Sequence, residues 1–286
     1  MLGGHKMPSH AQKFETFRSL HFTDRAFVMP NPWDAGSARI LGHLGFAALA
    51  TTSAGYAFSV GKRDSFAGLS REEILANAAA IIAATDLPVS ADLEDGFGAA
   101  PEACAETIRL ASDIGLVGGS IEDATGNPDA PIYDLHQATE RVRAAAEAAK
   151  GRSFLLTARA ENYLWGKPNL VDTIDRLQAF SEAGADVLYA PGLPDLDAIA
   201  TVCRAVDKPV NVVMGLKGRF FSVEELSDAG VRRISVGGSF ARAALGALKR
   251  AAEEVLTAGT FTYAEDAMPD AEAASLMSPE KRASRQ

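Results

Sequence analysis

Residues 89–98 read Val-Ser-Ala-Asp-Leu-Glu-Asp-Gly-Phe-Gly, a short apolar segment that ends in three carboxylates and two glycines. Because Pro88 comes directly before it, residues 89–93 are predicted to form a buried strand. Side chains alternate along a strand, so Asp92 and Glu94 should lie on one face. Two carboxylates on one face repel each other unless one takes up a proton or a cation lies between them. The segment is therefore either a site for a hard divalent ion such as Mg²⁺ or a solvated acidic loop after an edge strand.

The same pattern, an apolar run followed by a helix, recurs along the chain. Seven further runs with strand character occupy residues 27–31, 47–52, 118–123, 154–159, 185–190, 210–214 and 233–237. Helix signals follow them; Ser70 and Glu73, for example, have the spacing of a capping box. Eight short apolar strands, each followed by a helix, predict an α/β fold of the (β/α)8 TIM-barrel type. A doubly wound open sheet is the alternative, and eight units within about 250 residues favour the barrel.

This pattern divides the chain into three parts. Residues 1–24 form a polar leader with a short helix, residues 25–258 form the barrel, and residues 259–286 form a polar, Ala-rich tail. The tail is either an arm that packs on a neighbouring subunit or a loose terminus. Cys104 and Cys203 lie on predicted helices without a CxxC or Cys/His grouping, so we interpret both as packing residues.

The net charge and the hydropathy of the chain limit the kinds of molecule that it is expected to bind. The net charge of −9 gives no basic surface for nucleic acid or for an anionic membrane. There is no apolar run long enough to span a bilayer, and the segment that begins at Met1 lacks the apolar core of a signal peptide. We therefore expect a cytoplasmic protein, and any small anionic substrate must be attracted by local cations.

Polar residues gather where the predicted strands end, which is where barrels of this type place their catalytic groups. The first five strands are followed, in turn, by Asn31 and Asp34, Ser53 and Gly55, Asp92 and Glu94, Glu122 and Asp123, and Arg159 and Glu161. Any one of these residues can have a structural role. Several carboxylates and one arginine at a single barrel mouth indicate a metal-dependent site.

The charges suggest how such a site would work. Mg²⁺, or Mn²⁺ in its place, would be held by Asp92, with Glu94 and Glu122 binding it directly or through its waters. The ion would chelate a substrate that carries adjacent carboxylate and carbonyl or hydroxyl oxygens, and it would neutralise the enolate or alkoxide that forms. Arg159 offers a forked cation for the substrate carboxylate. Backbone N–H groups of residues 53–55 offer a site for a second anionic oxygen.

These motifs resemble the isocitrate lyase and phosphoenolpyruvate mutase superfamily over roughly residues 25–258. The matching segments are 30–39 (Pro-Asn-Pro-Trp-Asp-Ala-Gly-Ser-Ala-Arg), 52–55 (Thr-Ser-Ala-Gly), 61–64 (Gly-Lys-Arg-Asp), 91–98, 121–123 (Ile-Glu-Asp) and 157–159 (Thr-Ala-Arg). The resemblance implies a barrel of the phosphoenolpyruvate/pyruvate type. It also implies that Asp92 is the direct Mg²⁺ ligand, with Asp64, Glu94 and Glu122 in the outer shell of the metal.

The resemblance further implies a substrate site and an assembly. Ser53, Ala54, Gly55 and Arg159 would hold the α-oxy carboxylate, and Asn211 would line the pocket. Arg159, Glu122 and Asp64 would act in catalysis. The protein would be a homo-oligomer, a tetramer or a dimer, in which the last helix packs on a neighbouring barrel.

The loop after the fourth strand departs from the superfamily pattern. Isocitrate and methylisocitrate lyases carry a Lys-Lys/Arg-Cys-Gly-His motif there, and its cysteine serves as proton donor. Residues 124–131 of this chain read Ala-Thr-Gly-Asn-Pro-Asp-Ala-Pro, without cysteine, lysine or histidine. The loop is also short for the Lys and Asn of the phosphonate-processing members. The sequence is most similar to the methylisocitrate lyase-like or carboxyvinyl-carboxyphosphonate phosphorylmutase-like subgroup.

Three functions follow as hypotheses. The first is a Mg²⁺-dependent lyase that cleaves a C–C bond next to an α-oxy carboxylate, as a methylisocitrate lyase or an oxaloacetate decarboxylase does, with water or Tyr163 protonating the product. The second is a mutase or hydrolase that acts on a C–P bond. The third is a barrel that binds a 2-oxo acid without turnover, against which the grouped acids and Arg159 argue.

Overall fold

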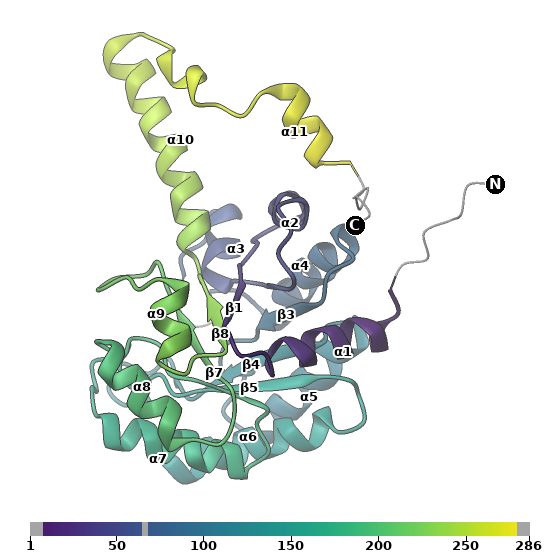
Figure 1. The fold of residues 1–286 in the computed structure, drawn as a ribbon, viewed down its shortest axis with the longest axis vertical. Coiled ribbons are helices and arrows are strands. Elements are labelled where there is room, and N and C mark those ends of the chain that lie inside the picture. Colours follow the sequence, from purple (N-terminus) through teal and green to yellow (C-terminus); the bar gives the residue numbers. More distant parts are fainter. Residues whose placement is uncertain (1–7, 65–67, 279–286) are drawn as a thin grey trace, which may run out of the picture.

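The computed structural model describes residues 8–64 and 68–278, and within them eight parallel strands curve into a nearly closed barrel (Figure 1). The sheet order is β1-β8-β7-β6-β5-β4-β3-β2. The strands are Phe27–Met29 (β1), Leu49–Ala50 (β2), Val89–Asp92 (β3), Gly118–Glu122 (β4), Leu155–Arg159 (β5), Val187–Tyr189 (β6), Val210–Val213 (β7) and Arg233–Ser235 (β8). The predicted TIM barrel is confirmed, and every predicted apolar run contributes one strand.

Each strand is followed by a helix, and most of the helices cover the outside of the barrel (Figure 1). They are His10–Leu20 (α1), Ala35–His43 (α2), Ser53–Ser59 (α3), Arg71–Ala84 (α4), Pro101–Asp113 (α5), Leu135–Ala149 (α6), Leu170–Glu182 (α7), Leu196–Ala205 (α8), Val223–Asp228 (α9), Ser239–Ala258 (α10) and Asp270–Leu276 (α11), with a 3₁₀ turn at Thr262–Glu265 (η1). The capping box predicted at α4 is present: Ser70 Oγ accepts from Glu73 N at 3.2 Å, and Glu73 Oε2 accepts from Ser70 N at 2.8 Å.

The seam between β1 and β2 is closed by a hydrogen bond and by one side chain rather than by a strand ladder. Ala50 N donates to Pro30 O at 3.0 Å. The amide of Asn31 donates to Thr51 O at 2.8 Å, and its Oδ1 accepts from the N–H groups of Val236 and Gly237, both at 2.9 Å. Asn31 therefore ties together the ends of β1, β2 and β8, and its role at this position is structural as well as cavity-lining.

Helix α1 contributes the aromatic residue that packs against β4. Phe17 is fully buried, and it belongs to the same apolar cluster as Met29, Val117 and Leu155. A Cβ on Gly118 would lie 2.9 Å from Phe17 Cε1, so a glycine at this strand position leaves room for the ring. The helix predicted within the leader thus forms part of the folded body.

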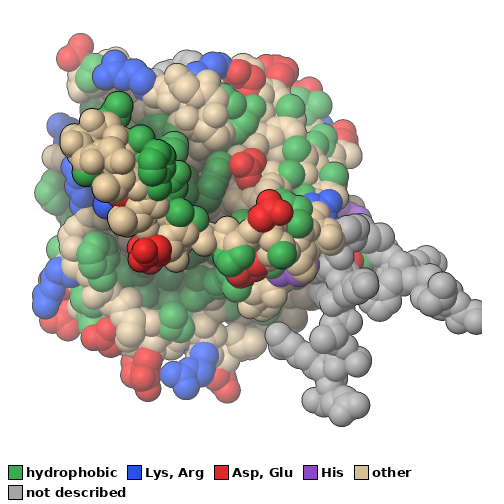
Figure 2. Space-filling model, turned by 90° about the horizontal axis from the view of Figure 1, so that it is seen from above, with side chains coloured by type: hydrophobic (Ala, Val, Ile, Leu, Met, Phe, Trp, Pro, Cys, Tyr) green, Lys and Arg blue, Asp and Glu red, His purple; other side chains and the backbone are tan. Residues whose placement is uncertain are grey.

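Helix α10 projects away from the barrel, and the chain returns through η1 and α11 towards α2 (Figure 1). Leu248 and Leu256 on α10 are 66% and 85% exposed. Seen from the outer end of α10, apolar side chains show among acidic ones (Figure 2). The rest of the predicted tail, residues 279–286, and residues 1–7 of the leader lie outside the described residues. None of the described helices is long and apolar enough to cross a lipid bilayer.

Candidate active site

A cavity of about 430 Å³ opens at the C-terminal ends of the strands. All eight strands contribute lining residues directly, and the loops that follow them add the rest. The strand residues are Met29 (β1), Ala50 (β2), Asp92 (β3), Glu122 (β4), Arg159 (β5), Tyr189 (β6), Asn211 and Val213 (β7) and Ser235 (β8). The acidic members of the lining are Asp64, Asp92, Glu94, Glu122 and Glu161. The cavity therefore collects four of the carboxylates predicted at one barrel mouth, whereas Asp123, which pairs with Arg176 at 3.0 Å, is not part of the lining.

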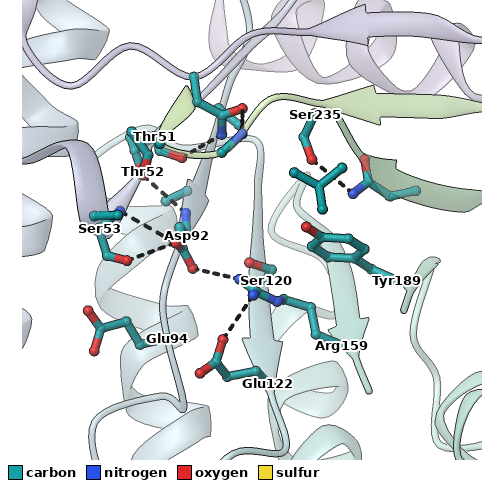
Figure 3. Close-up of a pocket in the computed structure, with 18 of the residues that line it drawn as sticks. Thr51, Thr52, Ser53, Asp92, Glu94, Ser120, Glu122, Arg159, Tyr189 and Ser235 are labelled. Atoms are coloured by element: carbon teal, nitrogen blue, oxygen red, sulfur yellow. Dashed lines mark hydrogen bonds and ion pairs between the residues drawn. The ribbon is translucent and has the colours of Figure 1, made fainter. Parts of the chain in front are cut away.

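Arg159 is the central cation of this cavity (Figure 3). Its Nη1 lies 3.1 Å from Asp92 Oδ1, and its Nη2 lies 3.2 Å from Glu122 Oε2. Nε donates to Glu161 Oε1 at 2.8 Å, and the guanidinium stacks 4.9 Å from the ring centroid of Tyr189. One arginine thus links the carboxylates at the ends of β3, β4 and β5. These three contacts fix the orientation of the guanidinium.

Asp92 is oriented from two sides. Its Oδ2 accepts from Ser53 Oγ at 3.0 Å, and its backbone N–H donates to Thr51 Oγ1 at 3.0 Å. Figure 3 shows the Asp92 carboxylate between Ser53 and Arg159. Since Ser53 begins α3 and Arg159 ends β5, the position of Asp92 depends on contacts from both sides of the barrel mouth.

Glu94 and Asp64 differ from the other acids because, within the described part of the chain, neither carboxylate has a hydrogen bond or an ion pair with another side chain. Burial, followed by the carboxylates of Asp92, Asp64 and Asp95, raises the pKa of Glu94 to about 8. Burial and then the charge of Asp92 raise the pKa of Asp64 as well. These two groups are held near other negative charges without a cation of their own.

The loop that carries Glu94 has an irregular backbone. The strand ends at Asp92, and Glu94 has φ of +48°, so the alternation of a strand does not extend to it. Both side chains nevertheless line the cavity, while Leu93 and Asp95 are buried on the other side. The buried Arg141 holds this loop in place. Its guanidinium donates to the carbonyls of Gly98 at 2.5 Å and Ala99 at 2.7 Å, and also to Asp95 O.

The lining residues fit a hard divalent cation. Five carboxylates line the cavity against two arginines, Arg159 and Arg233. Two of these carboxylates, those of Glu94 and Asp64, have no side-chain partner among residues 8–64 and 68–278. No three Asp, Glu, His or Cys side chains in the described residues enclose a metal by themselves. Mg²⁺ does not require such a cage, because it usually keeps several waters and binds through one or two carboxylates and the substrate. The donor set of Asp92, Glu94 and Glu122 is of the oxygen type that this ion prefers.

The floor of the cavity is a network of neutral and cationic groups. Arg233 donates to Asn211 Oδ1 at 2.9 Å and to Thr157 Oγ1 at 2.9 Å, and Asn211 Nδ2 donates to Ser235 Oγ at 3.2 Å. Burial lowers the pKa of Arg233 to about 9. Asn211 therefore lines the cavity as a residue whose amide is already fixed by its neighbours.

Most of the site residues predicted from the sequence come together in this cavity. The lining includes Ser53, Ala54, Asp64, Asp92, Glu94, Glu122, Arg159 and Asn211. Gly55 is not part of the lining: it is buried in α3, and its N–H donates to Thr52 Oγ1 at 3.2 Å. A Cβ there would lie 2.7 Å from Thr52 Cγ2, so this glycine serves close packing. Asp34, which follows β1, accepts from Ser37 N at 2.7 Å and caps α2.

The short loop at residues 124–131 lies outside the cavity lining. Hydrogen bonds within the loop hold its shape: Thr125 N donates to Pro131 O at 2.9 Å, and Thr125 Oγ1 donates to Ala130 O at 2.6 Å. Tyr163, named above as a proton donor, is also absent from the lining. The tyrosine that lines the cavity is Tyr189, and the only feature that marks it in the sequence is its place at the end of an apolar run.

Tyr189 is one of several cavity residues that the sequence reasoning did not select. The others include Ser120, Leu164, Trp165, Arg233 and Ser235. Glu161, which follows the fifth strand, makes the shortest contacts with Arg159, a role that its position in the sequence does not predict. The position of Tyr189 can be predicted in part from the strand register, because Arg159 pairs with Tyr189 in the ladder between β5 and β6. Leu164 and Trp165 lie on the loop between β5 and α7, and no repeating sequence pattern predicts the conformation of this loop.

Comparisons with known proteins agree with this geometry. The family model described as phosphoenolpyruvate phosphomutase matches residues 17–256. A solved structure from Burkholderia cenocepacia J2315, provisionally named a lyase/mutase, is 56% identical, with a TM-score of 0.91 and coverage of 93% of this chain and 95% of that chain.

Two curated relatives span most of the barrel. An uncharacterized protein of Mycobacterium tuberculosis (strain H37Rv) is 32% identical over 243 residues, which are 84% of this chain and 88% of that protein. The 2-methylisocitrate lyase of Shewanella oneidensis (strain MR-1) is 29% identical over 214 residues, or 72% of each chain.

Proposed function

The chain belongs to the phosphoenolpyruvate phosphomutase family, and on that premise we propose that it is a Mg²⁺-dependent lyase that cleaves a C–C bond next to an α-oxy carboxylate. The observation that carries the proposal is the excess of carboxylates around Arg159, in which Glu94 and Asp64 have no side-chain partner within the described part of the chain. Asp92, Glu94 and Glu122 would hold the ion. When bound, Mg²⁺ supplies positive charge for the adjacent oxygens of the substrate and for the negative charge that cleavage leaves on oxygen.

The residues of the chain divide the remaining work. Arg159 is held by Asp92, Glu122 and Glu161, so its position is set before a substrate arrives. Its guanidinium binds the substrate carboxylate by charge-assisted hydrogen bonds. Ser53, whose hydroxyl lies 3.0 Å from Asp92, fixes the orientation of that carboxylate. Such prior ordering reduces the reorganisation needed during the reaction.

We assign the protonation of the product to Tyr189. Its ring lines the cavity beside Arg159, and burial raises the pKa of its hydroxyl to about 12, so it carries its proton at neutral pH. The O–H bond breaks as the proton passes to the carbon of the enolate, and water from the cavity mouth returns a proton to the tyrosinate. This role replaces that of a loop cysteine, which residues 124–131 do not contain.

Product release identifies the reaction. We would measure pyruvate formation with a lactate dehydrogenase couple from oxaloacetate, 2-methylisocitrate and phosphonopyruvate, with and without Mg²⁺. Turnover of one of the carbon acids only when Mg²⁺ is present supports the lyase. Turnover of phosphonopyruvate alone would replace it with chemistry at a C–P bond.

Calorimetry tests the metal site separately. Oxalate mimics the enolate, and we expect its Mg²⁺-dependent binding to disappear in Asp92→Ala. Asp113→Ala is the matched control, because Asp113 is an exposed carboxylate that pairs with Arg152 at 2.8 Å and does not line the cavity. Unchanged oxalate binding in Asp92→Ala would refute the metal assignment.

We also propose that the protein is a homo-oligomer, a dimer or a tetramer, that forms through α10. The support is the projection of this helix and the exposure of Leu245, Leu248 and Leu256 along it (Figure 1). An apolar helix face of this kind is typical of a protein interface. Light scattering should give a multiple of the 30.1 kDa chain mass, and Leu248→Asp should lower it; a monomeric wild type would refute the proposal.

A further inference from the structure

We propose that a second cavity, adjacent to the first, binds an alkyl chain of the substrate that ends in an anionic group. The inference rests on the function proposed above and adds the class of substrate to it. The second cavity has a volume of about 440 Å³. Both cavities are lined by Ala54, Asp64, Leu164, Val213, Leu216 and Gly238, so they share a wall. In this proposal, a substrate whose α-oxy carboxylate lies beside Asp92 reaches the second cavity past these shared residues.

Apolar side chains form much of the lining of the second cavity. Its lining includes Phe58 from α3, Leu193 from the loop after β6 and Met214 from the loop after β7. Two of its apolar side chains are unusually accessible, since Leu164 is 47% and Phe220 is 68% exposed. An apolar cavity of this size with few polar groups is typical of a small-molecule subsite. Away from its basic residues, this lining suits methylene groups, whereas a hydroxyl group there would lose water without gaining hydrogen bonds.

Positive charge gathers along the same lining. Lys217, Arg219 and Arg242 are its charged members apart from Asp64, which lies on the shared wall. Among the described residues, none of these three cations forms an ion pair with a carboxylate. The chain as a whole carries a net charge of −9, so this group of three unpaired cations contrasts with the overall acidic character of the protein. They match a second negative charge at the far end of the substrate.

The loop that carries two of these cations is fixed at its start. Arg242 Nη2 donates to Gly215 O at 2.7 Å, which joins α10 to the loop after β7. Gly215 has φ of +84°, and a Cβ there would lie 2.6 Å from Ser239 Oγ, so the loop packs directly against the first turn of α10. The basic residues therefore occupy a defined edge of the cavity rather than a free loop tip.

These observations select a class of substrate. The head is the α-oxy carboxylate of the proposed function, the middle is a chain of methylene groups, and the far end is a carboxylate or a comparable anion. The chemical class is a long-chain 2-oxo or 2-hydroxy dicarboxylic acid. Burial of each methylene is expected to strengthen binding by about fourfold. The exposed cations should add about threefold for the terminal charge, an increment that falls at high salt.

Oxamate and its N-substituted derivatives test this inference, because all of them carry the same head group. With Mg²⁺ present, calorimetry would compare oxamate, N-alkyl oxamates and N-(ω-carboxyalkyl) oxamates with two to six methylenes. We expect affinity to rise at least tenfold along the alkyl series. We expect a further rise of about threefold for the carboxyalkyl derivative of the best length.

Variants separate the two parts of the subsite. Lys217→Ala and Arg219→Ala should each reduce the affinity ratio of the carboxyalkyl to the alkyl derivative, and Leu193→Gln should reduce the gain along the alkyl series. Lys208→Ala, a lysine outside both linings, is the control and should keep both ratios.

Each outcome decides one claim. If oxamate binds and chain length has no effect, the second cavity is not a substrate subsite, and the proposed function stands. If the alkyl series gains affinity and the carboxylate adds nothing, the anionic end is refuted. If neither oxalate nor oxamate binds with Mg²⁺, the proposed function fails, and the subsite inference fails with it.

Discussion

Mild acid should destabilise the protein through one buried histidine. His21 lies at the C-terminal end of α1, where its Nδ1 is 2.9 Å from Phe17 O and its Nε2 is 3.3 Å from Arg233 Nη1. The rings of Phe17 and Phe27 stand edge-on to it, with centroids 4.9 and 5.0 Å away. A neutral imidazole satisfies this site, because Nδ1–H donates to the carbonyl and Nε2 accepts from Arg233. A second ring proton would point at the guanidinium.

The magnitude follows from the shift of the titration. Burial, followed by the charge of Arg233, lowers the pKa of His21 from 6.5 to about 3. Between these two values the unfolded chain binds more protons than the folded chain, so the free energy of unfolding falls as the pH falls through this window. The loss from His21 is about 2 kcal/mol at pH 5 and about 3 kcal/mol at pH 4, relative to pH 8.

Urea unfolding of the wild type and of His21→Gln at pH 8 and pH 5 measures this term. The amide can keep both hydrogen bonds without titrating, so the variant should lose about 2 kcal/mol less than the wild type between the two pH values. Carboxylates with raised pKa values, such as Glu94, shift stability in the opposite direction, but they are common to both proteins and cancel in the comparison. Equal pH dependence in the two proteins would refute the assignment of a neutral, buried His21.

Three further changes test other parts of the structure. Arg176→Met should destabilise the fold by about 3–5 kcal/mol, because it leaves the buried Asp123 carboxylate without the guanidinium 3.0 Å away; urea unfolding measures this, and adding Asp123→Asn should recover most of the loss. Gly55→Ala should cost about 1–3 kcal/mol through the contact of its Cβ with Thr52 Cγ2 at 2.7 Å, and an unchanged melting temperature would contradict the packing role of this glycine. Tyr189→Phe should lower kcat by about 10²-fold or more while Mg²⁺-dependent oxalate binding is kept, and full turnover in this variant would remove the hydroxyl from the protonation step.

Several features of the fold follow from the sequence because they depend on local periodicity. The apolar runs predicted the eight strands, and the Ser70 and Glu73 pair predicted the start of α4, since a cap depends only on residues three apart. The gathering of Asp92, Glu122 and Arg159 was also predictable. In a parallel barrel the C-terminal ends of all strands meet at one mouth, so polar residues at strand ends become neighbours whatever their sequence separation.

Other features depend on loop conformations and on packing between segments far apart in the sequence. No repeating pattern of apolar residues predicts either of these. Glu94 reaches the cavity through a left-handed turn rather than through strand alternation, and Leu164 arrives from an irregular loop. Lys217 and Arg242 come to one cavity because the loop after β7 packs on the start of α10.

The sequence by itself determined the barrel, its strand ends and the acidic character of the mouth, since each of these follows from residue order along one element. Only the tertiary structure decided that Tyr189 lies beside Arg159, that Gly55 packs against Thr52 outside the cavity lining, and that His21 meets Arg233 across 212 positions of the chain. The physical reason is that such contacts depend on the direction of each side chain and on the close packing of elements far apart in sequence, and neither is encoded in local hydrophobic spacing.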